Sequence, residues 1–155
     1  MTIALYRGTD FISKSILWFS RGGYSHAAIL LNDGRIVEAY PFKGVRLRQS
    51  ISDQMNHTTV DIFECPTTVE QNEIIENFLT MQVGKGYDYL SIAGFVFHTT
   101  KEGRKQLRRW ICSELVFATF QKAGINLLDR IDAWKVSPTI LSYSTKMVPV
   151  ATIKI

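Results

Sequence analysis

Apolar residues gather in short stretches separated by turn residues over much of the chain, a pattern typical of short strands. We expect strands at residues 2–6, 25–31, 35–40, 44–48 and 60–64. Pro66 follows the last of these and closes it, because proline cannot donate to a sheet ladder. Residues 148–155 alternate in character and are expected to return as an edge strand.

Other stretches repeat their apolar positions every three or four residues, which is the period of an amphipathic helix. This pattern predicts helices over residues 11–19, 69–83 and 111–123. Gly84 and Gly124 follow the last two and are expected to end them. Residues 89–97 are apolar and predict a short buried helix, and Ser137-Pro138 predicts a short helical turn.

These elements together indicate an α+β fold, in which one antiparallel sheet or small barrel packs against helices. The chain shows no internal repeat and no linker rich in Pro, Gly or Ser. Its 155 residues suit one domain, which we expect to span residues 1–155.

The turn Asn32-Asp33-Gly34 joins two of the predicted strands into a hairpin. If the turn has three residues, His26 faces Tyr40, and Glu38 lies diagonally from His26 on the same face. A carboxylate there can fix the tautomer of the imidazole and leave its other nitrogen to act as a base. A turn of two residues would instead put His26 and Glu38 on opposite faces.

Cys112 stands at the start of the helix predicted at 111–123. The N-terminus of a helix carries partial positive charge and free N–H groups, and both favour a thiolate. The same N–H groups can stabilise the oxyanion that forms when a thiolate attacks a carbonyl. Cys65 ends an apolar strand and is expected to be a buried core residue. A Cys65–Cys112 bridge and two reduced thiols both remain open.

Composition and charge restrict the function only mildly. Hydrophobic residues make up 46% and charged residues 21% of the chain, an ordinary balance for a folded protein. The net charge of +4 permits contact with phosphate, anionic lipid or acidic polymers without requiring any of them, and it does not favour a nucleic-acid-binding class.

The first residues do not have the pattern of a signal peptide. Arg7, Asp10 and Lys14 interrupt the apolar residues, and no small-residue cleavage site follows. The longest apolar runs, 16–19 and 92–97, are too short to span a bilayer. We therefore expect a cytoplasmic protein, with peripheral membrane contact left open.

Several segments in order resemble the circularly permuted NlpC/P60 papain-like proteins, in particular the YiiX/YebB-like branch, and more distantly the lecithin:retinol acyltransferase group. They are Gly8-Thr9-Asp10-Phe11, Trp18-Phe19-Ser20-Arg21, Tyr24-Ser25-His26-Ala27-Ala28-Ile29, Asp33-Gly34-Arg35-Ile36-Val37-Glu38-Ala39, Gly86-Tyr87-Asp88-Tyr89, Trp110-Ile111-Cys112-Ser113-Glu114-Leu115-Val116, and Ser137-Pro138 with Leu141 and Ser142. The resemblance covers nearly the whole chain, and His26 precedes Cys112, as the permuted order requires.

The resemblance implies a cysteine-dependent hydrolase or acyltransferase that works through a thioester. It makes Cys112 the nucleophile, His26 the base and Glu38 the residue that orients His26. Tyr87 and Trp110 are expected to bind the substrate, with Tyr87 either lining the pocket or serving as a second donor to the oxyanion. No metal and no organic cofactor is expected.

The substrate stays open between a peptide amide and an acyl lipid. Apolar residues that flank Cys112 would suit an acyl chain, or they are simply core; they are Trp110, Ile111, Leu115 and Phe117. The alternative function is an inactive papain-like module that binds anionic lipid, a membrane surface or nucleic acid. It would use the basic residues Lys101, Arg104, Lys105, Arg108 and Arg109.

Overall fold

A computed structural model describes residues 1–7, 23–51, 58–88 and 109–155 of the chain. The helices expected at 11–19 and 89–97 lie outside the described residues, and so do the basic residues from 101 to 108. Within the described ranges, no helix combines the length and the apolar character that crossing a membrane would need.

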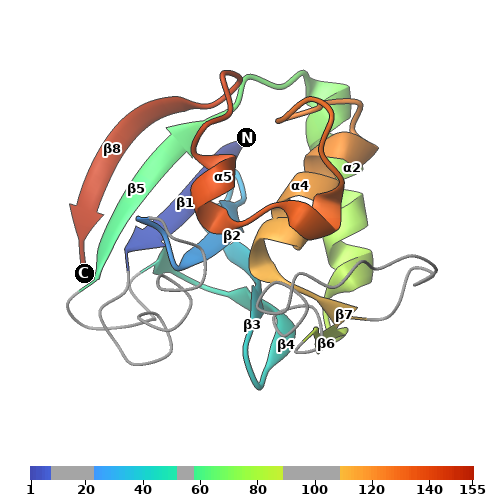
Figure 1. Cartoon of the computed structure of the whole chain (residues 1–155). Helices are drawn as coiled ribbons and strands as arrows, with labels where there is room; N and C mark the ends of the chain where they lie inside the picture. Colours follow the sequence, from blue (N-terminus) through green and yellow to red (C-terminus); the bar gives the residue numbers. More distant parts are fainter. Residues whose placement is uncertain (8–22, 52–57, 89–108) are drawn as a thin grey trace.

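A six-stranded antiparallel sheet forms the centre of the molecule, with strand order β4-β3-β2-β1-β5-β8 (Figure 1). Its strands are β1 (Thr2–Arg7), β2 (His26–Leu30), β3 (Ile36–Tyr40), β4 (Gly44–Arg48), β5 (Thr59–Glu64) and β8 (Val148–Lys154). Two short strands, β6 (Gly86–Tyr87) and β7 (Arg109–Trp110), form a separate parallel pair. All six strands expected from the sequence are present, and β8 occupies a sheet edge as expected.

Helices α2 (Val69–Gln82) and α4 (Cys112–Lys122) lie on the same side of the sheet (Figure 1). The Thr68 side chain caps α2 in a capping box with Gln71, which satisfies backbone groups that a helix start leaves open. A 3₁₀ turn, η2 (Ala133–Lys135), and the short helix α5 (Pro138–Leu141) follow α4. The α+β class is therefore confirmed.

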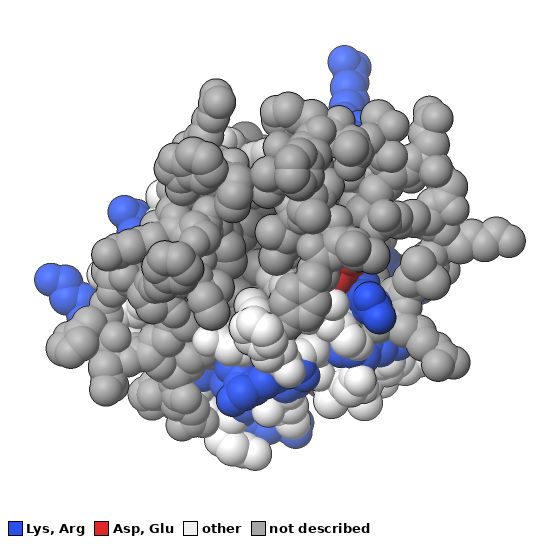
Figure 2. All heavy atoms as spheres, turned by 60° about the horizontal axis from the view of Figure 1, so that its bottom comes forward, with Lys and Arg blue, Asp and Glu red and all other residues white. Residues whose placement is uncertain are grey.

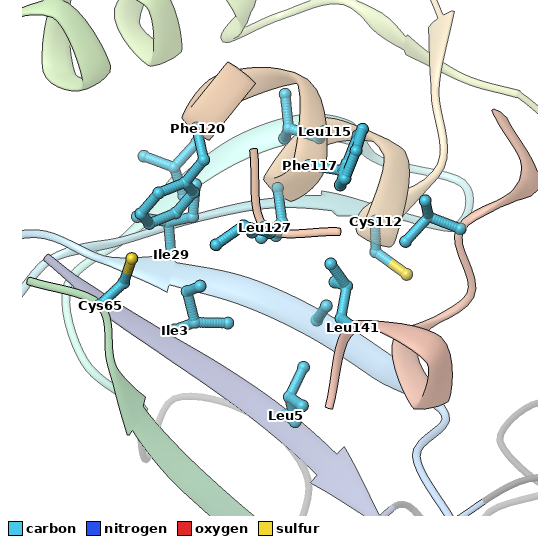
Figure 3. Packing of buried hydrophobic residues seen from close by; sticks show 14 of the residues in the cluster. Ile3, Leu5, Ile29, Cys65, Cys112, Leu115, Phe117, Phe120, Leu127 and Leu141 are labelled. Carbon is cyan, nitrogen blue, oxygen red and sulfur yellow. The ribbon is translucent and has the colours of Figure 1, made fainter. Parts of the chain in front are cut away.

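The main core fills the space between α4 and the sheet, with α4 packed on β2 and β3. Figure 3 shows side chains from both layers meeting there, among them Ile3, Leu5, Leu115, Phe117 and Phe120. Because strand residues alternate between faces, a smaller cluster forms on the opposite face of the sheet. It consists of Ala4, Tyr6, Ala28, Ile36, Val60 and Ile62.

The buried face of α2 differs in one position from the pattern in the sequence. Ile75 and Leu79 are buried as expected, but Ile74 is 43% exposed. The four apolar residues of this stretch span more of the circumference of α2 than its contact with α4 covers, so Ile74 faces outward. They are Ile74, Ile75, Phe78 and Leu79.

The β2–β3 hairpin has the three-residue turn that the site requires. Ile29 pairs with Val37 and Leu30 with Ile36, and the Leu31 N–H donates to Arg35 O at 2.8 Å. Gly34 closes the turn with φ of 86°, a value that favours glycine. The register continues towards His26 and Tyr40, whose ring centroids lie 5.8 Å apart.

Candidate active site

His26 and Glu38 meet through a direct hydrogen bond between neighbouring strands. His26 is the first residue of β2, and Glu38 lies at the middle of β3. His26 Nε2 lies 2.8 Å from Glu38 Oε2, and the Glu38 side chain is fully buried. The diagonal placement expected from the hairpin is confirmed, and it leaves Nδ1 of the imidazole to face another partner.

That partner is the thiol of Cys112, which opens α4 and is buried. Burial disfavours an imidazolium, but the charge and hydrogen bond of Cys112, together with those of Glu38, outweigh it. The pKa of His26 is thereby raised to about 10. The structure thus brings Cys112, His26 and Glu38 together from α4, β2 and β3, in the order nucleophile, imidazole and carboxylate.

Contacts at the first residues of α4 fix the position of Cys112. Ser113, the next residue, donates its hydroxyl to Val136 O at 2.6 Å, and both residues are buried. Leu115 and Phe117 lie in the core below. Among the described residues, no side chain caps the start of α4. The first-turn N–H groups of a helix lack acceptors within the helix. They are therefore suited to meet negative charge beside the thiol.

Glu38 is surrounded by positive charge. Its Oε1 accepts from Arg46 Nε at 2.8 Å and forms an ion pair with Arg46 Nη2 at 2.6 Å. Arg48 Nε lies 2.9 Å from the same oxygen. Burial alone would raise the pKa of Glu38, but His26, Arg48 and Arg46 lower it to about 2. Glu38 is consequently an anion at any ordinary pH.

The second guanidinium is held from the opposite side by β1 and by the chain after β4. Arg48 donates from Nη2 to the Tyr6 hydroxyl at 3.1 Å and from Nη1 to Ser50 O at 3.0 Å. Burial raises the pKa of Tyr6 to about 12, so this hydroxyl stays neutral. The Tyr6 ring also lies 5.3 Å from the His26 ring, between centroids.

Arg46, Arg48 and Tyr6 were missed by the sequence reasoning. A signal was available, because Arg46 and Arg48 alternate along β4 and so share one face of the sheet. The pairing of Glu38 with Arg46 across β3 and β4 makes that the face of Glu38.

Tyr87 and Trp110 pair through their backbones in β6 and β7, and their assignment to a substrate pocket stays a prediction. Tyr87 is buried within the main core. Trp110 faces α2, where its indole N–H donates to Gln82 Oε1 at 3.2 Å and its ring packs edge-on against Phe78.

The basic segment of the alternative function is represented in the described residues by Arg109 alone, which is exposed. Figure 2 shows Lys and Arg side chains on the face that carries the lower end of the sheet.

Cys65 is a core residue, as expected. It is buried beside Ile3 and Phe120, at the far end of the core from Cys112 (Figure 3). Burial raises the pKa of its thiol, which makes it a poor nucleophile. Both cysteines are free, so the structure holds no Cys65–Cys112 bridge.

The described residues do not form a metal site. Among them, no group of three or more His, Cys, Asp or Glu side chains is placed to hold an ion. Both oxygens of Glu38 already bind cationic side chains, and Nε2 of His26 is engaged with Glu38. The donor set therefore does not fit a resident metal ion.

Comparisons with known proteins yield a likeness of fold. No protein-family model and no curated protein matches the chain. The solved structure of YiiX from Escherichia coli O157:H7, described as a metalloprotein of DUF1105, is similar with a TM-score of 0.69 and 18% sequence identity. The match covers 99% of this chain and 97% of that chain. At this identity the comparison shows that the chain has a YiiX-like fold.

Proposed function

We propose that this chain is a cysteine-dependent hydrolase or acyltransferase of the circularly permuted NlpC/P60 papain-like type. One observation carries the proposal: His26 lies between two partners. It bonds Glu38 through Nε2, and it forms a second side-chain hydrogen bond with Cys112. A buried nucleophile, imidazole and carboxylate in this order form the arrangement that activates a thiol for attack on a carbonyl.

His26 takes the proton from Cys112, either already in the resting site as an ion pair or as the reaction begins. The thiolate attacks an amide or ester carbonyl, and the carbonyl electrons move onto the oxygen. N–H groups at the start of α4 stabilise this oxyanion. When it collapses, the bond to the leaving amine or alcohol breaks, and His26 supplies the proton that the leaving group needs.

A thioester on Cys112 remains, together with a neutral His26. His26 then takes a proton from water, or from an acceptor hydroxyl or amine, as that group attacks the thioester. The second oxyanion collapses, the acid or transferred acyl product leaves, and Cys112 departs as thiolate beside the protonated His26. Throughout the cycle, Glu38 holds Nε2 of His26 and so keeps Nδ1 directed at the reacting atoms.

The substrate class remains a peptide amide or an acyl lipid. Ile111, Leu115 and Phe117 are buried in the main core, so these three do not form an exposed acyl groove. YiiX is described as a metalloprotein. The donor set of the described residues does not fit a metal ion, and no step above uses one.

Selective alkylation tests the nucleophile without knowledge of the substrate. Iodoacetamide at neutral pH should label Cys112 about tenfold faster than Cys65, because only Cys112 has a histidine beside it that accepts the thiol proton. Peptide mapping after brief exposure measures both sites. The His26→Ala variant should lose this selectivity, and Cys65→Ala is the matched control that should keep it. Equal, slow labelling of both thiols in the wild type would overturn the proposal.

Turnover is tested by offering acyl-lipid and cell-wall peptide substrates to the wild type and to Cys112→Ala. The proposal expects release of product from one class, and its loss in the variant. A covalent acyl adduct on Cys112, detected by intact mass after rapid quenching, would identify the thioester. Product release that survives Cys112→Ala would contradict the mechanism.

A further inference from the structure

Glu38 has more positive charge around it than the orientation of one imidazole requires. His26, Arg46 and Arg48 all lie within 3 Å of its carboxylate oxygens, at 2.8, 2.6 and 2.9 Å. A buried arginine costs desolvation energy, and replacing buried ions by apolar residues often leaves stability unchanged or improved. Stability alone therefore does not explain why Arg48, whose side chain is 6% exposed, lies here.

Arg48 is fixed on three sides. Its Nη1 and Nη2 donate to Ser50 O and to the Tyr6 hydroxyl, while Nε lies 2.9 Å from Glu38 Oε1. Among the described residues, Nε makes no bond of hydrogen-bond geometry, so its contact with Glu38 is an ion pair. The guanidinium plane of Arg48 is thus oriented by β1 and by the backbone after β4. Its position beside Glu38 therefore does not depend on His26.

Arg46 holds the same oxygen in a different way. Its side chain is 22% exposed, and its guanidinium stacks over the Tyr40 ring, with Cζ 4.1 Å from the centroid. A partly solvated arginine is easier to displace than Arg48, which is buried and held by two hydrogen bonds besides its ion pair with Glu38. Arg48 is consequently the firmer of the two supports.

We propose that Arg48 is a positioning residue of the active site: anchored by Tyr6 and Ser50, it holds Glu38 anionic and in place to bond His26. The inference rests on the proposed function for its catalytic meaning. Arg48 changes the titration midpoint of His26 by holding Glu38 in place, and not through the direct effect of its own charge.

The direction in which the His26 titration midpoint moves distinguishes an effect through Glu38 from a direct effect of the Arg48 charge. Among the described residues, the groups that face His26 are the Cys112 thiol from α4, Glu38 and Tyr40 from β3, and Tyr6 from β1. Arg46 and Arg48 of β4 lie behind Glu38. Removing a nearby cation without moving anything would raise the His26 midpoint. Loss of the Glu38 contact would lower it, because an opposite charge within hydrogen-bond distance favours the imidazolium.

The experiment is an NMR titration of the His26 ring in the wild type, Arg48→Met and Arg35→Met. The chain has three histidines, and the signal lost in His26→Gln identifies the right one. Arg35 bonds Asp33 at the other end of the same hairpin, so Arg35→Met controls for loss of one positive charge. We expect Arg48→Met to lower the His26 midpoint by about 1–3 pH units and Arg35→Met to leave it unchanged. An unchanged or raised midpoint in Arg48→Met would overturn the inference.

Two milder variants keep the test decisive if Arg48→Met does not fold. Arg48→Lys retains the charge but lacks the forked donors, and its midpoint should fall below that of the wild type. Tyr6→Phe removes one anchor and leaves Arg48 itself intact, so it should shift the midpoint in the same direction. Wild-type midpoints in both variants would overturn the inference.

The outcome is independent of turnover. If Cys112 proved unreactive while Arg48→Met lowered the His26 midpoint, the proposed hydrolase would fail and the support of Glu38 by Arg48 would stand. If Cys112 were selectively alkylated and the midpoint did not fall in Arg48→Met, the hydrolase would stand and Arg48 would have no positioning role.

Discussion

Two buried carboxylates, Glu38 and Asp61, lie in the same sheet and have different surroundings. Glu38 is bound by three cationic side chains and is 0% exposed. Asp61, on the opposite face, is 6% exposed. Its Oδ2 accepts from Arg7 Nε at 2.8 Å and the Tyr24 hydroxyl at 2.6 Å, and its Oδ1 from the Thr152 hydroxyl at 2.7 Å.

The two carboxylates differ in the kind of partners they bind and in what those partners contact. Arg7 is half exposed, and the other two partners of Asp61 are neutral hydroxyls, so its contacts tie β1, β5 and β8 together. Glu38 instead bonds His26, and His26 bonds the thiol of Cys112. Burial and an arginine partner are common to both carboxylates, so neither feature marks a reactive site. The link to a titratable imidazole and a thiol does.

Glu38→Ala gives the largest expected effect, a loss of about 3–5 kcal/mol in the free energy of unfolding. The substitution leaves Arg48 buried with no carboxylate, and an uncompensated buried charge is strongly destabilising. Urea denaturation monitored by tryptophan fluorescence measures the change. A loss no greater than that caused by Asp61→Ala would break the contrast between the two carboxylates.

Acid sensitivity should also separate them. The pKa of Glu38 is about 2 in the folded protein, against 4.5 for an ordinary glutamate. The unfolded chain therefore binds more protons between these values, and the stabilisation by Glu38, about 3 kcal/mol, is present above pH 4.5 and is lost as pH falls through 2. Subtracting the unfolding free energy of Glu38→Gln from that of the wild type at each pH isolates this contribution. A difference that stays constant with pH would contradict it.

Asp61→Asn should have the smallest effect, about 1–2 kcal/mol in stability, because the amide retains one acceptor and its arginine partner is partly solvated. The rate of Cys112 alkylation should not change, whereas Glu38→Gln should slow it. The two variants measured side by side sharpen the comparison. Equal slowing in both would mean that Asp61 also belongs to the active site.

The sequence was informative where local chemistry determines structure. Asn32-Asp33-Gly34 predicted a hairpin, and the glycine at φ of 86° supplies the left-handed position that its turn needs. That turn fixes the register and hence the meeting of His26 with Glu38. The placement of Cys112 at a helix start followed equally from the apolar period after it.

The alternation of Arg46 and Arg48 places both on one face of a strand, but the turn before that strand has no signal that fixes which residues of β3 they oppose. The loop between β3 and β4 has φ of 65° at Phe42, a residue type that rarely adopts it. Gly44 then approaches Lys85 so closely that a Cβ would lie 2.2 Å from its carbonyl oxygen. The register that sets Arg46 opposite Glu38 thus depends on a strained position and on a contact distant in sequence.

The outermost strand, β8, bears on how copies of this molecule behave in concentrated solution. All seven of its residues are exposed, and it carries the apolar side chains of Val148, Val150 and Ile153 at the edge of the sheet. A long apolar edge is a template for strand addition and aggregation. Here Pro149 offers no N–H, and the pairing with β5 skips Val150, which disrupts the ladder. The proline and the bulge in β8 therefore oppose the addition of a further strand at this edge.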